Sequence, residues 1–350
     1  MATKVLITGA SGYIGGSLLK HLLASPTAKD VKIFALVRSD SQVAEVQRME
    51  GVTPLRADLS DEKAISAAVV DHQITIVIET VDAVSFAPAK AFIEGLAAVG
   101  KSTGASTHFF HTSGAKLVSS HTGIPGDETL SDSSAVYELQ KTQISPFPPM
   151  NPVIAVNTDI IDFAGANNVK SYIIVPPMVY GPGEGFGNKT SIQILALFQI
   201  VQATRKVFQV DATETSWMLC HLRDLTSLYI TILQAIITKQ DPPAGKKGFY
   251  FAENGQFKWN DLSKGIAANL KVDQSVVPAT PADLEEMGKI LCCPAAFVPV
   301  SVAGSCNLRG DNGRALGWKP EYDLQHLMSE KGVGDDTLLM VREMERKAAL

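Results

Sequence analysis

Cysteine, long apolar runs and surplus positive charge are all scarce in this sequence. Only 4 of its 350 residues are cysteine. No two of them stand in the C-x-x-C spacing that zinc sites use, and so few cysteines do not make a disulfide scaffold. We therefore expect buried, reduced thiols in a reducing compartment and no metal site.

Apolar runs are short as well. The most apolar stretch, residues 295–304, carries Pro299 in its middle, and no run approaches the roughly 20 residues that a membrane-spanning helix needs. The sequence starts directly on a strand-like run at residues 4–8, which leaves no room for a signal peptide. These features predict a cytoplasmic protein that does not bind a membrane.

Positive charge does not dominate, because 31 Lys and Arg stand against 36 Asp and Glu, a net charge of −5. Such a chain lacks the cationic surface that binds nucleic-acid phosphates. Its length suits one large core with a second lobe. We expect a small-molecule substrate as the partner, no nucleic acid, and a monomer or a homodimer.

The first half alternates between strand-like and helix-like segments. Apolar, strand-like runs occupy residues 5–8, 31–37, 52–56, 75–78, 107–111 and 172–175, and amphipathic segments occupy 13–24, 42–49, 62–70 and 88–99. Strands that are apolar throughout are typical of a parallel sheet buried on both faces. The alternation predicts a Rossmann-type α/β fold, a doubly wound parallel sheet.

After Val175 the rhythm changes to a Gly/Pro-rich stretch followed by mostly helical patterns. Helices are expected at residues 192–203, 222–238, 260–270 and 281–290 and from Asp323 onward, with one strand at 248–252. We predict a Rossmann domain that binds NADP(H), made of residues 1–180 and 219–254. Residues 181–218 and 255–350 would form a discontinuous, smaller and mostly helical substrate lobe.

A glycine-rich turn directly follows the first strand. It reads Gly9-Ala10-Ser11-Gly12-Tyr13-Ile14-Gly15, between a strand and an amphipathic helix, which is the context a dinucleotide-binding turn requires. Gly9 would allow the tight turn, Gly12 the approach of a pyrophosphate, and Gly15 close packing of helix on strand. Its G-x-x-G-x-x-G spacing resembles that of the short-chain dehydrogenase/reductase superfamily. Cofactor contacts are expected from Gly9, Ser11, Gly12, Tyr13, Ile14 and Gly15.

The choice of cofactor depends on the end of the second strand. An acidic residue there would select NAD, but this chain has Arg38 and Ser39, which suit a 2′-phosphate. Asp40 lies two places too late unless the turn is shifted. NADP(H) is favoured and NAD(H) stays possible. By the same resemblance, Asp58 and Leu59 would border the adenine, and Thr80, after the fourth strand, would face the cofactor.

Carbonyl reduction needs a proton donor, a cation that lowers its pKa, and a hydroxyl that orients the substrate. Tyr137 and Lys141 are one helical turn apart, and Ser113 follows the fifth strand. The intervals resemble those of the extended branch of the superfamily, as do V-Y-G-P at 179–182, H-L-R-D at 221–224 and L-G-W-K-P at 316–320. The resemblance implies that Tyr137 is the general acid, that Lys141 assists it and that Ser113 orients the carbonyl. Pro176, Met178 and Val179 would line the nicotinamide end.

Three departures from that family pattern matter. Pro146 predicts that the Tyr137 helix ends within about a turn of Lys141, and Phe147 and Met150 then lie either in a lid or in an ordinary surface loop. Val175 and Met178 stand where nucleotide-sugar enzymes carry R-x-x-N, which favours an apolar substrate. No role follows from the sequence for Glu79.

Three functions remain open at this point. The leading one is an NADP(H)-dependent oxidoreductase that reduces a ketone or aldehyde of a small, fairly apolar molecule. The second is an epimerase, dehydratase or isomerase that retains its cofactor. The third is a regulatory protein that senses NADP(H) without catalysis, and for it we expect the Tyr137 phenol to lie far from the nicotinamide.

Overall fold

A seven-stranded parallel sheet forms the centre of the computed structural model, which describes residues 3–348. Its strand order is β11-β7-β5-β4-β1-β2-β3. The strands are β1 (Thr3–Thr8), β2 (Val31–Val37), β3 (Val52–Arg56), β4 (Ile76–Glu79), β5 (Thr107–Thr112), β7 (Val169–Val175) and β11 (Phe249–Phe251). This order confirms the predicted doubly wound, Rossmann-type sheet.

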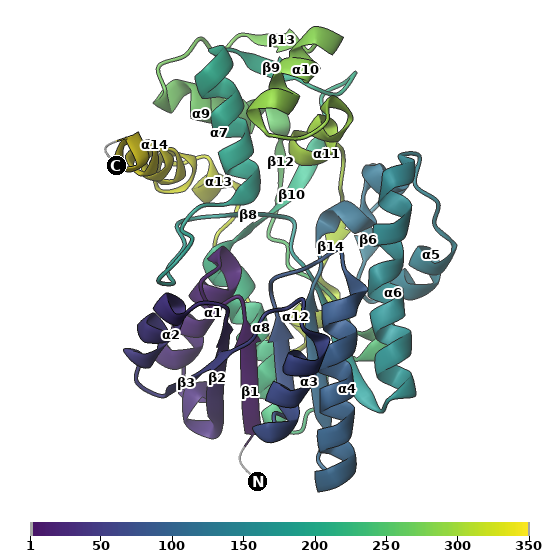
Figure 1. The fold of residues 1–350 in the computed structure, drawn as a ribbon. Coiled ribbons are helices and arrows are strands. Elements are labelled where there is room, and N and C mark those ends of the chain that lie inside the picture. Colours follow the sequence, from purple (N-terminus) through teal and green to yellow (C-terminus); the bar gives the residue numbers. More distant parts are fainter. Residues whose placement is uncertain (1–2, 349–350) are drawn as a thin grey trace.

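Helices cover both faces of this sheet (Figure 1). Helices α1 (Tyr13–Ala24) and α8 (Leu222–Ile237) pack together on one face, and α3 (Glu62–Asp71), α4 (Phe86–Thr103) and α6 (Asn151–Ala166) pack on the other. Helix α2 (Asp40–Gln47) lies between β2 and β3 in the chain. Coverage on both faces explains why the strands are apolar throughout instead of alternating.

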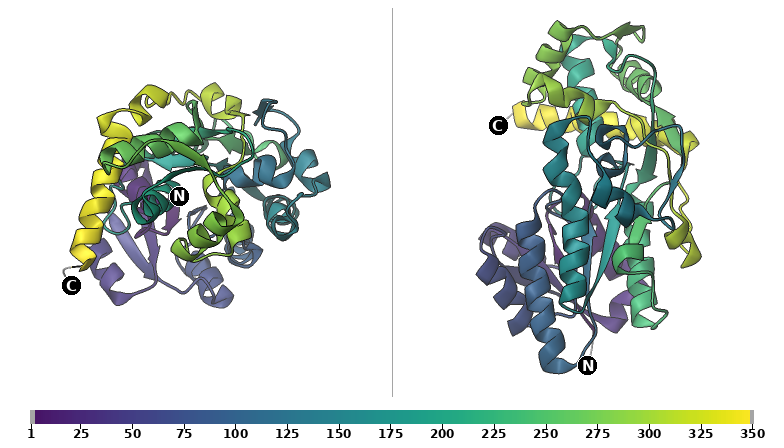
Figure 2. Two further views of the ribbon diagram at one scale, coloured as in Figure 1. Left: turned by 90° about the horizontal axis from the view of Figure 1, so that it is seen from above. Right: turned by 90° about the vertical axis from the view of Figure 1, so that its right-hand side faces the viewer.

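The second lobe lies beyond the carboxyl ends of the sheet strands (Figures 1 and 2). A three-stranded sheet, β8 (Met178–Tyr180), β10 (Ser216–His221) and β12 (Gln256–Lys258), connects the two parts. The lobe itself contains β9 (Val207–Gln209), β13 (Val276–Pro278), α7 (Ile192–Thr204), α9 (Trp259–Asn269), α10 (Pro281–Ile290), α11 (Val298–Val302), α13 (Leu324–Leu327) and α14 (Asp335–Ala348). Parallel sheets bind ligands at this edge.

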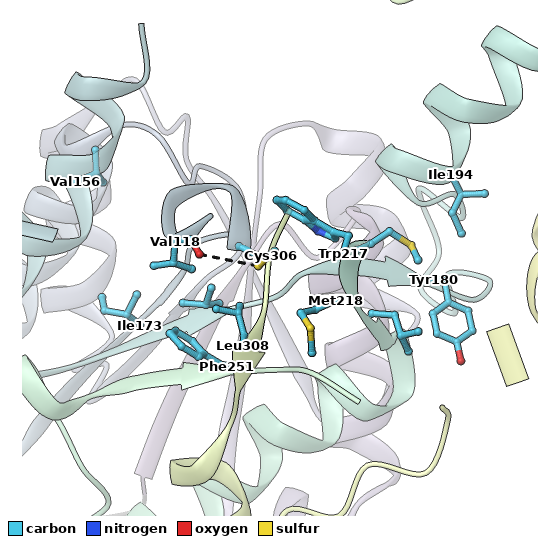
Figure 3. Close-up of a cluster of buried hydrophobic side chains, with 14 of the residues drawn as sticks. Val118, Val156, Ile173, Tyr180, Ile194, Trp217, Met218, Phe251, Cys306 and Leu308 are labelled. Carbon is cyan, nitrogen blue, oxygen red and sulfur yellow. Dashed lines mark hydrogen bonds between the residues drawn. The ribbon is translucent and has the colours of Figure 1, made fainter. Parts of the chain in front are cut away.

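The core continues from the sheet into the lobe. Trp217 and Met218 of β10 are buried in one cluster with Cys306 and Leu308, and Figure 3 shows Ile173 of β7 and Phe251 of β11 in the same cluster. The predicted buried thiols are found for Cys220 and Cys306, but Cys292 is exposed, in the turn after α10. No helix within residues 3–348 is long and apolar enough to cross a membrane.

One helix was not expected, and two structural expectations need correction. Residues 151–166, for which no helix was predicted from the sequence, form α6, and Pro152 is tolerated in its first turn, where no N–H is needed. The long helix expected from Asp323 is broken by a π-helical turn, Glu330–Gly334. The part of the predicted second lobe that contains β14 (Leu308–Arg309) and α12 (Asp311–Ala315) instead packs against β6 (Leu130–Ser131), β11 and α8.

Candidate functional site

The glycine-rich turn leaves no room for a Cβ at Gly9 or Gly15 and only a tight fit at Gly12. Gly9 has φ +65°, and a Cβ there would lie 2.6 Å from Thr80 Oγ1. A Cβ on Gly12 would lie 3.0 Å from the Gly9 carbonyl oxygen, and one on Gly15 would lie 2.8 Å from the Gly9 carbonyl carbon. Gly12 begins α1 without a side-chain cap. The first N–H groups of the helix are therefore free for an anionic ligand.

A segment from beyond β8 closes on this turn. The Asn188 N–H donates to the Ser11 carbonyl at 2.9 Å, and the Glu184 N–H donates to Ser17 Oγ at 2.9 Å. Gly187 lies so close that a Cβ there would be 2.8 Å from the Ser11 carbonyl carbon. Glu184 also pairs with Arg223 Nε at 2.6 Å, which ties the segment to α8. The segment thus binds both the glycine-rich turn, at Ser11, and helix α1, at Ser17.

A cavity of about 410 Å³, which we call the loop cavity, lies on the β2 side of the turn. Its lining includes most of the residues expected at the adenosine end, namely Gly9, Ser11, Gly12, Arg38, Asp58, Leu59 and Thr80. The pKa of Asp58 is lowered, chiefly by the hydrogen bond from the Ser60 N–H. Arg38 is exposed, whereas Asp40 pairs with Arg56 Nη1 at 2.7 Å.

Ser39 does not line the loop cavity but shapes its wall. Its hydroxyl accepts the Gln42 N–H at 3.3 Å in a capping box at the start of α2. The side-chain amide of Gln42, through Nε2, in turn donates to Ser11 Oγ at 2.8 Å. The end of β2 and the glycine-rich turn are therefore linked through a single side chain.

A second cavity of about 410 Å³ lies between the sheet and the second lobe, and we call it the interlobe cavity. Tyr13 and Ile14 of α1 form one wall; Ser113 and Pro176 follow the ends of β5 and β7, and Val179 lies in β8. The remaining lining is mostly apolar: Ala83, Val84, Gly114, Ala115, Lys116, Leu117, Pro149, Met150, Val153, Pro177, Ser191, Ile192, Gln193, Trp217, Phe297 and Val300. Such a lining fits an apolar small molecule.

Ser113 carries the cavity hydroxyl that is best placed to bind a polar atom of a ligand. Its N–H continues the sheet pairing by donating to the Ile174 carbonyl at 2.8 Å, while its Oγ is buried without a hydrogen-bond partner in the described chain. A buried hydroxyl without a partner is costly, so a ligand atom is its natural partner. Met178, expected in the same wall, is fully buried in the core and does not line the cavity.

Tyr137 and Lys141 do not join Ser113, contrary to the sequence-based expectation. They lie on the short α5 (Val136–Thr142), which ends one residue after Lys141, as Pro146 predicted. Tyr137 donates to Asp162 Oδ1 at 2.6 Å, and Lys141 Nζ lies 2.7 Å from Asp162 Oδ2. The hydrogen bond to Asp162 raises the pKa of the Tyr137 phenol, which opposes the role of a general acid.

The reason for this misplacement is topological. The helix that crosses from β5 to β7 along the sheet is α6, and α5 packs outside it (Figure 1). The 3-10 turn η4 (Pro148–Met150), just before α6, reaches the cavity with Pro149 and Met150, and the start of α6 reaches it with Val153. Phe147 packs edge-on against Phe297 of the second lobe, with ring centroids 5.0 Å apart. The proline-rich segment is therefore a cavity wall, and the tyrosine–lysine spacing reflects only the local turn of α5.

Glu79 has a structural role that the sequence did not reveal. One carboxylate oxygen accepts the N–H groups of Val81 and Asp82 at 2.6 and 2.8 Å. The other lies 3.2 Å from His111 Nδ1, in a pair that is almost fully buried. The pair shapes the turn after β4 whose next residues, Ala83 and Val84, line the interlobe cavity.

Comparison with known proteins gives a consistent family and fold. The family described as the NAD dependent epimerase/dehydratase family matches residues 5–243. A relative named oxidase ucsJ, from Acremonium sp., is 25% identical over 342 residues, which cover 91% of this chain and 93% of the relative.

Two solved structures share the fold across nearly the whole chain. Vestitone reductase from alfalfa is 15% identical with a TM-score of 0.61, covering 98% of this chain and 99% of that one. UDP-glucose 4-epimerase from Thermotoga maritima, solved with UDP-glucose, is 14% identical with a TM-score of 0.63, covering 97% and 100%. At these identities the likeness concerns the fold alone.

Proposed function

Because the chain belongs to the NAD dependent epimerase/dehydratase family, we propose that it is an NADP(H)-dependent reductase of a ketone or aldehyde in a small, apolar molecule. The interlobe cavity carries this proposal, because it joins the start of α1 to Ser113 through mostly apolar walls. A relative named as an oxidase and a structural neighbour named as a reductase support redox chemistry.

The residues of the loop cavity support the choice of NADP(H). The Arg38 side chain is exposed at the end of β2 and has no carboxylate within ion-pair distance in the described part of the chain. The nearest acidic alternative, Asp40, is engaged by Arg56. Because the Arg38 guanidinium has no ion-pair partner and the Asp40 carboxylate already pairs with Arg56, this end of β2 favours a cofactor that carries a 2′-phosphate.

The chemistry assigned to this chain is modest. The nicotinamide, when bound, would supply the hydride, and the proton that completes the alcohol would come from solvent by way of the Ser113 hydroxyl. Ser113 donates a hydrogen bond to the substrate carbonyl oxygen and fixes its orientation, since its hydroxyl has no competing partner. The apolar walls exclude water, which strengthens that hydrogen bond as charge develops on the oxygen. Tyr137 and Lys141 take no part, because their side chains are committed to Asp162.

One observation favours a second candidate. With the Tyr137 phenol on α5 and bonded to Asp162, the chain is also suited to a regulatory role in which NADP(H) is bound without turnover. The two candidates share the loop cavity and differ only in what happens in the interlobe cavity.

The experiment has a binding arm and a turnover arm. We expect wild type to bind NADPH more tightly than NADH by calorimetry, and Arg38→Ala to weaken NADPH binding about tenfold, or about 1.4 kcal/mol, with little effect on NADH. Equal loss for both cofactors would refute the 2′-phosphate assignment. A panel of apolar aldehydes and ketones is then tested for NADPH consumption and reduced product. Binding without any turnover would select the regulatory candidate.

A further inference from the structure

One charged residue, Lys116, belongs to the otherwise uncharged lining of the interlobe cavity. Lys116 lies in the 3-10 turn η2 (Ala115–Val118), which directly follows Ser113 and Gly114. Among the described residues that line the cavity it is the only charged one. The Ala115 N–H donates to the Pro176 carbonyl at 3.0 Å, which fixes the turn against the strand end that Pro176 follows.

This ammonium group has no counter-ion in the described chain. Within residues 3–348, no carboxylate lies within 4.0 Å of Lys116 Nζ, and Nζ donates no hydrogen bond. Burial lowers the pKa of Lys116, and the two titratable groups nearby are the Cys293 thiol and His121. An ammonium against apolar walls is costly unless an opposite charge joins it.

The walls around Lys116 show what must carry that opposite charge. Trp217, Phe297 and Met150 offer aromatic and aliphatic surface, which suits the body of an aromatic or branched apolar molecule. A sugar nucleotide would bring two phosphates and many hydroxyls, for which one cation and a few hydroxyls are too few partners. A single anionic group on an apolar body matches both the charge and the surface.

We propose that the interlobe cavity binds a mainly apolar molecule that bears one anionic oxygen group, such as a carboxylate or an ionised phenol, and that Lys116 is its counter-ion. The inference deepens the proposed function and rests on its assignment of the substrate to this cavity. Lys116 anchors the anionic end, and Ser113, three positions earlier in the chain, receives the carbonyl. Lys116 is thus a residue that determines specificity.

A pair of fluorescent probes tests this without knowledge of the substrate. Anilinonaphthalene sulfonate and phenylnaphthylamine share the same apolar body, but only the first is anionic. Their dissociation constants are measured with saturating NADPH for wild type, Lys116→Met and Lys116→Arg. Lys246→Met is the matched control, because Lys246 lies over the Tyr137 ring, 4.4 Å from its centroid, and outside the cavity.

We expect Lys116→Met to weaken binding of the anionic probe at least about tenfold, equivalent to about 1.4 kcal/mol, and to leave the neutral probe unchanged. Lys116→Arg should retain most of the affinity, and Lys246→Met all of it. In wild type, the affinity for the anionic probe should fall as the pH rises through the pKa of Lys116, whereas the affinity for the neutral probe should not change.

Several results would overturn the inference. These are equal effects of Lys116→Met on both probes, no effect on either, or failure of both probes to bind wild type. Should Lys116→Met fail to fold, the wild-type pH series decides, because a pH-independent difference between the probes excludes a lysine counter-ion. The probes are also titrated without NADPH, so a failure of these readouts is separate from a failure of NADPH binding or turnover.

Discussion

The substitution Gly15→Ala tests the central claim about the glycine-rich turn. A Cβ at this position would lie 2.8 Å from the Gly9 carbonyl carbon and closer still to the Gly9 oxygen and Thr80 Oγ1, whereas Cβ atoms essentially never come within 3.0 Å of such neighbours. Neither neighbour can move freely. Gly9 is held at φ +65°, and Thr80 Oγ1 donates to the Thr8 carbonyl at 2.8 Å.

The expected cost is the overpacking penalty, about 1–3 kcal/mol in the free energy of unfolding. The matched control is Gly165→Ala, on the exposed side of α6, where a Cβ meets nothing within 4 Å. There the same chemical change should stabilise the chain by roughly 0.5–1 kcal/mol, because alanine is the better helix former. Identical substitutions should therefore act with opposite signs.

The assay is urea unfolding of the three proteins, combined with NADPH titration. Gly15→Ala should lower the unfolding midpoint and weaken NADPH binding at least about tenfold, whereas Gly165→Ala should raise the midpoint and leave binding unchanged. If Gly15→Ala matched wild type in both measurements, the turn would have slack that the structure does not show, and the reasoning would be refuted.

Two further changes have defined outcomes. Tyr137→Phe removes the hydrogen bond to the half-exposed Asp162 and should lower the free energy of unfolding by only about 0.5–1 kcal/mol. Turnover should stay within about twofold of wild type. A large loss of turnover at unchanged stability would return Tyr137 to the active site. Burial raises the pKa of Asp336 to about 6, so its stabilising contribution, full below pH ~4, is lost as the pH rises through 6. The free energy of unfolding of Asp336→Asn, measured with urea, should therefore rise relative to that of wild type by up to about 3 kcal/mol between pH 4 and 7. A constant difference across that range would contradict the raised pKa of Asp336.

The sequence was sufficient where short-range pattern decides the structure. The bounds of α1 and β2 were predicted to the residue, because an amphipathic helix after a glycine turn and a fully apolar strand leave few alternatives. The loop cavity is lined by the glycine-rich turn and by Asp58, Leu59 and Thr80, which the family resemblance placed beside the cofactor; their role there stays a prediction.

It was insufficient where tertiary packing decides. The spacing of Tyr137 and Lys141 places them on one face of α5, but the local sequence does not determine which part of the chain packs against that face. In the structure it is Asp162 of α6. Lys116 carries no motif at all. Its signal is the absence of a partner in a cavity, and that becomes visible only when the walls from distant parts of the chain are assembled.

The segment that closes on the glycine-rich turn also sets an order of events during synthesis. β1 and α1 leave the ribosome well before their partners, because Ser17 receives its bond from Glu184, 167 positions later, and Ser11 receives its bond from Asn188. A nascent chain that ends before these residues contains the complete glycine signature but not the finished turn. This part of the molecule is therefore completed only after the roughly 170 residues that separate its two halves have also been translated.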